Sequence, residues 1–234
     1  MVLATEITNF SMIGYEEVRK MRNVLFLMLA LALTTAGTAL ATGNQYEVGG
    51  AAEKGHTIPF YTTAAAMRFQ CMWFADEIGE KGSVARVEFM FQSGGATTTS
   101  VEGCKMILCH TTKTALTKTF KANYDFKTPV EVFKGKYAVP EGLEDGDWFT
   151  LCEPDNFIYN NRNNLLMEIS WASSSGATTK TYISTTEQPG RLRVFTETAE
   201  TGKLLPNQGH FARITIGNPA VSPTSLGRIK ALLH

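Results

Sequence analysis

The sequence has no excess of charge of either sign. It contains 22 basic and 22 acidic residues, so the formal net charge at pH 7 is zero. Proteins that bind nucleic acids generally carry clustered Lys and Arg, because contacts with phosphate dominate their affinity. The chain shows no such basic patch, and we therefore expect no nucleic-acid partner.

Long hydrophobic runs are missing as well. The apolar run at residues 24–33 has ten residues, whereas a helix needs about 20 to cross a bilayer. Arg22 precedes this run, and the small-x-small sequence at residues 39–41 follows it, as in a secretory signal peptide. We predict a signal peptide at residues 21–41 and a secreted or cell-surface protein with no membrane span after cleavage. A membrane anchor is the alternative.

The first 20 residues do not suit a signal peptide, which normally begins close to its charged region. Glu16 and Glu17 are atypical there. We predict that translation starts at Met21 and that residues 1–20 are a gene-model extension. A peptide from residues 1–18, detected in cells by mass spectrometry, would contradict this.

Cysteine is scarce, with four residues in the chain: Cys71, Cys104, Cys109 and Cys152. All four follow the predicted cleavage site, and an even number of cysteines in an exported chain favours disulfides. Four cysteines allow three pairings, among which the sequence does not choose. We predict at least one disulfide, and free buried thiols are the alternative in reducing surroundings.

The chain beyond residue 41 lacks long helical periodicity and instead alternates between apolar and polar residues. At residues 84–91, Val87 and Phe89 point one way while Arg86 and Glu88 point the other. Such alternation is typical of half-buried antiparallel strands, whose successive side chains leave opposite faces of a sheet. Further strands are predicted at residues 58–61, 67–74, 105–110, 131–137, 148–151, 164–171, 180–184, 191–195 and 211–216.

Turn-rich segments such as SGGATTTSVEG and NNRNN separate these strands. Short strands at such spacing predict an all-β fold, a two-layer antiparallel β-sandwich that is jelly-roll-like, with a barrel as the alternative. We expect an N-terminal arm at residues 42–56, the β-sandwich domain at residues 57–217 and a C-terminal tail at residues 218–234. The tail is either a short amphipathic helix or a sorting or attachment signal.

Several segments follow one another in an order that resembles a known module. They are IPFY, FADEIGEKGSVARVEFMF, CKMILCHTTKTAL, VFKGKY, DWFTL and NFIYNNRNNLLMEISW. Between residues 58 and 171, this order resembles a β-sandwich (jelly-roll-like) module of secreted and cell-surface proteins from Bacteroidetes-type bacteria. Asp76 stands where that module usually has a small residue, Asn161 stands near its usual glycine, and the cysteines lie outside its pattern. The resemblance implies an extracellular accessory or surface module and carries over no catalytic residue.

Familiar catalytic motifs are absent from the sequence, which has no HExxH, GxSxG, SxxK or P-loop. Of the four histidines, His110 directly follows Cys109. Neighbours on a strand point to opposite faces, so this pair cannot easily act as nucleophile and base. We predict no enzyme, no catalytic residue and no cofactor-binding or metal-binding residue.

Two acidic turns are candidate sites for binding calcium. Their carboxylates belong to Glu141, Glu144, Asp145, Asp147, Glu153 and Asp155. Ca²⁺ takes six to eight oxygen ligands, but the spacing matches no EF-hand loop. We expect solvated turns, with Ca²⁺ binding as the alternative.

Aromatic residues bear on binding. Trp171 is in phase with the apolar residues of its strand and Trp148 follows a turn, so both are expected in the core. Trp73 is the best candidate for an exposed ring, with packing in the core as the alternative. We predict Trp73 and Tyr61 as contacts for a ligand or partner.

These observations favour an exported, non-catalytic β-sandwich that acts as a structural or adhesive module of an extracellular or cell-surface assembly. Its partners would be further copies of itself or other surface proteins, because sheet edges offer unpaired backbone groups. A carbohydrate-binding module with glycan partners, Ca²⁺-dependent or not, is the alternative. A small secreted hydrolase is the third hypothesis.

Overall fold

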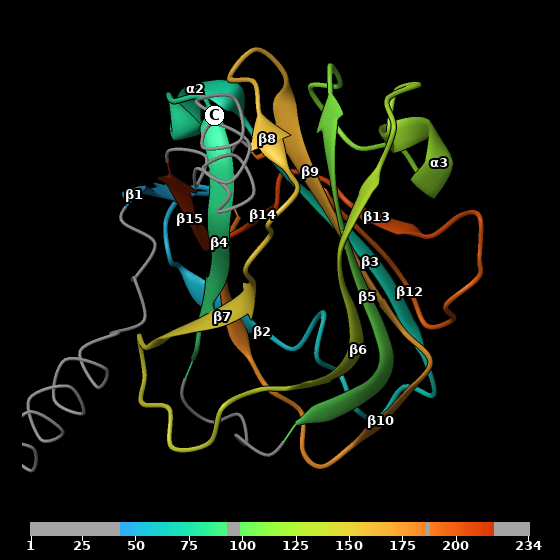
Figure 1. The fold of residues 1–234 in the computed structure, drawn as a ribbon. Helices are drawn as coiled ribbons and strands as arrows, with labels where there is room; N and C mark the ends of the chain where they lie inside the picture. The colour runs from blue at the N-terminus through green and yellow to red at the C-terminus, as the bar shows by residue number, and fades with distance from the viewer. Residues whose placement is uncertain (1–42, 93–98, 186–187, 218–234) are drawn as a thin grey trace, which may run out of the picture. The chain divides into compact units, whose positions relative to one another are not determined.

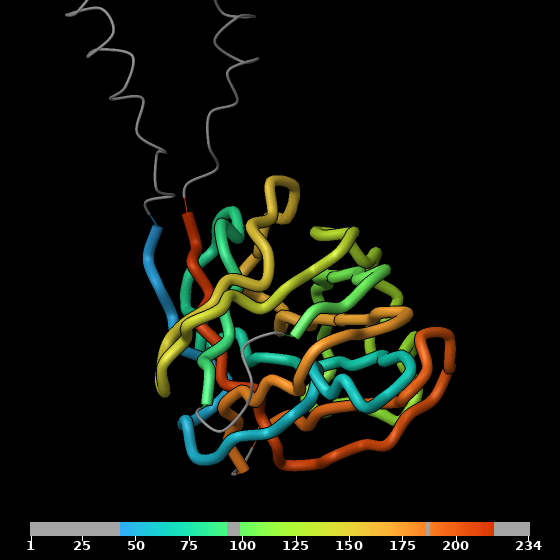
Figure 2. The backbone as a smooth tube through the Cα atoms, turned by 90° about the horizontal axis from the view of Figure 1, so that it is seen from below, coloured from blue at the N-terminus to red at the C-terminus, as the bar shows by residue number. Residues whose placement is uncertain are grey.

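Two antiparallel β-sheets pack face to face in the computed structural model, which describes residues 43–92, 99–185 and 188–217 (Figure 1). The smaller sheet has, in spatial order, β1 (Gly43–Val48), β15 (Ala212–Gly217), β4 (Gly82–Met90) and β7 (Trp148–Cys152), with β8 (Ile158–Tyr159) also beside β4. The first and last described strands, β1 and β15, run side by side (Figure 2).

The larger sheet is built around three strands, β5 (Ser100–Thr111), β9 (Asn164–Trp171) and β3 (Met67–Trp73). Its other strands are β6 (Val130–Ala138) beside β5, β10 (Ser173–Ser175) continuing β9, and β12 (Arg191–Val194) and β13 (Lys203–Leu205) beyond β3. A third, small sheet contains β14 (Gly209–His210), β11 (Thr181–Ser184) and β2 (Lys54–His56). The helices among the described residues are α2 (Ala75–Ile78) and α3 (Phe120–Asn123).

The core lies between the two large sheets and follows from the alternation of side chains along the strands. Val87 and Phe89 from β4 face Met167 and Ile169 from β9, and all four are fully buried. Removing such side chains from water stabilises the fold by about 1.5–3 kcal/mol each. The predicted all-β, two-layer antiparallel sandwich is confirmed, and the jelly-roll-like arrangement stays a prediction.

The start of the sandwich differs from the prediction. β1 pairs with β15 and β2 pairs with β11, so the segment expected to be an N-terminal arm belongs to the sheets from Gly43 onward. The strand predicted at residues 58–61 is wrong, because this segment is a turn containing Pro59. Proline has no N–H to give to a strand ladder. The predictions for residues 1–20, 21–41 and 218–234 lie outside the described residues.

Trp73 is a second difference. Its expected exposure is wrong, since the ring is fully buried and its Nε1 donates a 2.8 Å hydrogen bond to the carbonyl oxygen of His210. β3 is covered on both faces, by the smaller sheet on one side and by a separate apolar cluster on the other. A strand in that position has no face left for an exposed tryptophan.

The cysteines form a third difference, because the predicted disulfide is absent. Cys71, Cys104, Cys109 and Cys152 are all free and buried. Burial raises the pKa of Cys104 and Cys152 to about 12 and that of Cys109 to about 11. The structure thus shows the alternative, buried thiols that pack as small apolar side chains.

The outer face of the larger sheet is covered by the segment at residues 112–129, which includes α3. Leu116 and Phe120 from this segment pack on Met72, Leu166 and Leu192 of the sheet. The segment is also tied to the chain before β13, because Phe120 N–H donates to the carbonyl oxygen of Glu200 at 3.0 Å. This cover shapes the candidate site.

Candidate binding site

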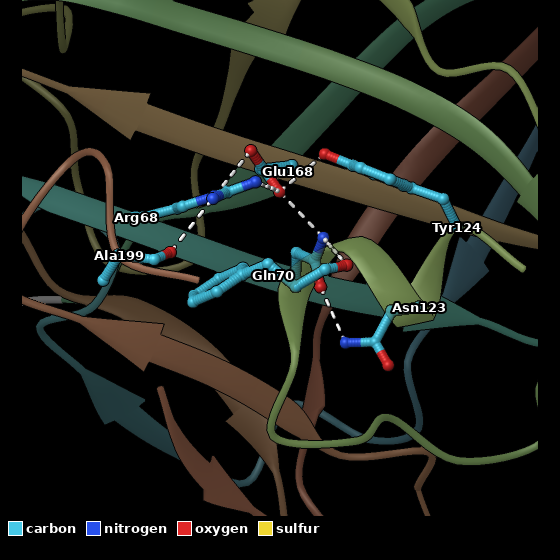
Figure 3. A network of polar contacts seen from close by, with 7 residues as sticks. Arg68, Gln70, Asn123, Tyr124, Glu168 and Ala199 are labelled. Carbon is cyan, nitrogen blue, oxygen red and sulfur yellow. Dashed lines mark hydrogen bonds and ion pairs between the residues drawn. The ribbon is translucent and has the colours of Figure 1, made fainter. Parts of the chain in front are cut away.

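A buried carboxylate holds the covering segment on the sheet (Figure 3). Glu168 on β9 is 4% exposed and accepts hydrogen bonds from Arg68, Gln70 and Tyr124. The guanidinium of Arg68 donates from Nε at 2.9 Å and from Nη2 at 3.2 Å, which makes the ion pair bidentate. Such pairs are stronger and more directional than neutral hydrogen bonds.

The same carboxylate changes the titration of its neighbours. Burial alone lowers the pKa of Arg68, but the hydrogen bonds and charge of Glu168 outweigh it and raise that pKa overall. Burial first, and the charge of Glu168 second, raise the pKa of Tyr124 well above its usual value. Arg68 therefore stays charged and Tyr124 keeps its proton, which is the state that this network requires.

An amide pair extends the network to the end of α3. Asn123 Nδ2 donates to Gln70 Oε1 at 2.8 Å, and Gln70 Nε2 donates to the carbonyl oxygen of Phe120 at 3.2 Å (Figure 3). Asn123 Oδ1 in turn accepts from the backbone N–H of Thr117 at 2.8 Å. The backbone at Thr117 and at Phe120 is thus hydrogen-bonded to the fully buried side chains of Asn123 and Gln70, and these bonds hold the segment in one conformation.

Two residues that follow Tyr124, the residue after α3, have left-handed backbone conformations. The φ angles of Asp125 and Phe126 are 51° and 59°. This region is uncommon for residues other than Gly and especially so for a bulky aromatic, and it costs of the order of 1 kcal/mol or more per residue. The conformation turns the Phe126 side chain fully into solvent, with a relative exposure of 105%.

A pocket of about 870 Å³ opens beside this ring. Its wall includes Lys113, Lys121, Asp125, Phe126, Lys127 and Glu200. We call it the lysine pocket. Its volume lies within the usual range for small-molecule sites, about 300–1,000 Å³.

Asp125 forms an ion pair with one lysine of the pocket. Its carboxylate accepts hydrogen bonds from the N–H and hydroxyl of Thr112, and it lies 3.6 Å from Lys113 Nζ. The hydroxyl of Thr112 is the main cause that lowers the pKa of Asp125, with Lys113 adding to it. Asp125 is therefore ionised at neutral pH and can accept further hydrogen bonds.

The site residues predicted from the sequence lie elsewhere. Trp73 is in the core, and Tyr61 is half-buried with its ring 5.7 Å from that of Phe195. The four cysteines do not line the lysine pocket either. Cys104 and Cys152 lie near each other in the core, where the charge of Cys104 adds to burial in raising the pKa of Cys152, and neither they nor the other predicted residues line the lysine pocket.

The acidic turns considered for calcium are engaged with the protein. Asp147 accepts a hydrogen bond from the N–H of Glu144 at 2.7 Å, Asp145 accepts from the hydroxyl of Tyr182, and Glu153 pairs with Arg86. Within the described ranges, the structure has no group of three or more His, Cys, Asp or Glu placed to hold a metal ion.

Sequence reasoning missed the lysine pocket, although a signal was present. The segment at residues 112–129 contains four lysines and three aromatic residues, with Asp125 as its one acidic residue. It shows neither strand alternation nor helical periodicity. A basic, aromatic segment without a regular element between two strong strands is a reasonable place to expect a binding loop.

Comparisons with known proteins identify no family, since no family model, curated protein or solved structure matches the chain. The resemblance to the Bacteroidetes-type module stays a prediction. In the part of the chain that the structure describes, no helix is both long and apolar enough to cross a membrane.

Proposed function

We propose that the chain is an exported, non-catalytic β-sandwich that acts as an adhesive module of a cell-surface or extracellular assembly, with the lysine pocket as its contact site. The observation that carries this proposal is Phe126, a fully exposed ring held in an unfavourable backbone conformation at the wall of a pocket. Backbone strain of this kind clusters at active sites and ligand clamps, and it is the strain at Phe126 that points to a function.

The support beneath the pocket also favours binding. Glu168, Gln70 and Asn123 fix the covering segment through buried hydrogen bonds. A preorganised site loses less conformational entropy when a ligand binds. The pocket wall contains no His, Cys or Ser, the residues that the hydrolase hypothesis requires to converge. We therefore favour binding over hydrolysis.

Self-association through sheet edges is a second route to an assembly. β1 and β7 are the outer strands of the smaller sheet, and β6 and β13 are those of the larger. Unpaired backbone groups at such edges can accept a strand from another chain. Sizing of the purified protein separates this route from binding through the pocket.

The proposal predicts that the exported protein binds extracellular polymers through Phe126. We expect the purified chain to bind at least one member of a panel of immobilised polysaccharides, mucin and matrix proteins. Phe126→Ala should weaken that binding about tenfold, since removing an aromatic anchor costs more than about 1 kcal/mol. Biolayer interferometry measures both affinities.

Ile158→Ala is the matched control, because Ile158 is also an exposed large apolar residue, at 65%, but lies on β8 of the other sheet. It should leave binding unchanged. A wild-type protein that binds nothing on the panel and remains strictly monomeric at high concentration would rule the proposal out. Addition of a chelator tests whether binding needs Ca²⁺.

A further inference from the structure

The lysine pocket combines positive charge that lacks a counter-ion with carboxylates that can accept hydrogen bonds. Among the described residues, Lys121 and Lys127 form no ion pair within 4.0 Å, whereas Lys113 shares Asp125. Asp125 and Glu200 belong to the same wall. A complementary ligand brings negative charge to the two unpaired lysines and hydrogen-bond donors to the carboxylates.

Phe126 adds a flat apolar surface to these polar groups. Both faces of its ring reach solvent, because the side chain is as exposed as in an extended chain. An apolar ring face gains free energy by covering another flat, weakly polar surface. The ligand thus has a ring with an apolar face in addition to its charged and donor groups.

We propose that the lysine pocket binds an acidic glycan. Carboxylate or sulfate groups of the saccharide lie against Lys121 and Lys127, its hydroxyl groups donate to Asp125 and Glu200, and one sugar ring lies on Phe126. This assignment rests on the proposed adhesive function and names the ligand class of the same site.

The carboxylates decide between a glycan and a single-stranded nucleic acid, which would also use lysines and a stacking ring. Both ligands carry repeated negative charges, but the deoxyribose of an internal nucleotide has no free hydroxyl to donate to Asp125 or Glu200. Arg68, the other cation of the wall, is already paired with Glu168. Hydroxyl groups of a saccharide instead find acceptors in both carboxylates.

The test measures dissociation constants by isothermal titration calorimetry for four probes. The probes are oligogalacturonate, which carries carboxylates, a heparin-derived oligosaccharide, which carries sulfates, maltohexaose, which is neutral, and an oligothymidylate. We expect one of the two acidic glycans to bind at least tenfold more tightly than maltohexaose or oligothymidylate. The acidic glycan that binds more tightly shows whether the site prefers carboxylate or sulfate groups. The affinity should fall as NaCl is raised, because salt screens exposed charges.

Lys121→Gln combined with Lys127→Gln should weaken binding of the acidic glycan at least tenfold and reduce its salt dependence. The matched control is Lys54→Gln with Lys81→Gln, which removes the same charge from exposed lysines at β2 and just before β4. Equal or tighter binding of maltohexaose or oligothymidylate overturns the assignment. If no acidic probe binds but polymer adhesion still depends on Phe126, the ligand class is wrong and the adhesive function stands. If no acidic probe binds and the protein also shows no adhesion that depends on Phe126, both the ligand class and the adhesive function are wrong.

Discussion

Glu168 shows how a single residue supports the candidate site without lining it. It is buried, and its two carboxylate oxygens accept hydrogen bonds from Arg68, Gln70 and Tyr124. A buried carboxylate costs free energy unless such partners compensate its charge. Its partners come from two different parts of the chain, so the residue joins the covering segment to the sheet.

Glu168→Gln should lower the free energy of unfolding by about 2–3 kcal/mol. Removing one member of a buried ion pair leaves the other charge uncompensated, at a cost of about 3–5 kcal/mol, and Arg68 retains some solvent contact that reduces this cost. Urea denaturation measures the change. We also expect weaker ligand binding, because the segment that carries Phe126 loses an anchor.

Glu88→Gln is the matched control for this prediction. Glu88 is equally buried and is paired with Arg213 by two hydrogen bonds, but it lies on the smaller sheet. We expect a similar loss of stability with no effect on ligand binding. Equal effects of both substitutions on binding would argue against a specific supporting role for Glu168.

The small third sheet is the element whose stability should depend most on pH. It contains His56 on β2 and His210 on β14, and the ring of His210 is fully buried. Burial, followed by the charge of Arg191, lowers the pKa of His56 to about 4 and that of His210 well below 6.5. Both rings are therefore neutral in the folded protein at neutral pH.

We expect the free energy of unfolding to fall as the pH drops from about 6.5 towards 4. In that window the unfolded chain binds protons at its histidines while the folded chain does not, so acid favours unfolding. His56 alone should contribute about 2–3 kcal/mol across this range. Urea denaturation at a series of pH values measures the slope.

His56→Gln should flatten this slope, since glutamine does not titrate. The control is His110→Gln, because His110 lies on β5 of the larger sheet and its pKa is lowered to a lesser degree. A slope that His56→Gln leaves unchanged would show that other groups cause the acid sensitivity.

The prediction of elements from the sequence succeeded where apolar and polar residue types alternate along a strand. β4, β9 and β15 were found in this way, although the face of β9 that carries Glu168 and Ser170 is buried as well. The turn at residues 58–61 was mistaken for a strand, since its apolar residues are buried without forming a ladder. α3 was missed because four residues are too few to show a helical period.

At the scale of the whole molecule, the reactivity of the four cysteines distinguishes the predicted disulfide from the observed free thiols. We expect less than about one thiol per native chain to react with Ellman's reagent, because burial raises the thiol pKa and blocks access. All four should react once the chain is unfolded in guanidinium chloride without a reducing agent.

Protein purified without a reducing agent is the right sample for this measurement, since a reducing agent would break a disulfide. Two unreactive cysteines after unfolding would show that one disulfide exists. Cys109→Ser serves as the control, because it should lower the count in the unfolded chain by one and leave the native count unchanged.

The sequence by itself determined the all-β class and the two-layer sandwich. The reason is physical: a side chain's position on a strand places it on one face of the sheet, so the pattern of burial can be read from neighbouring residues. The tertiary structure alone decided the candidate site. Arg68 and Glu168 are 100 residues apart, and Gln70 and Asn123 are 53 apart. No local pattern relates residues at such separations. The pairing of β3 with β9 brings Arg68 to Glu168, and the packing of the covering segment on these strands brings Asn123 to Gln70.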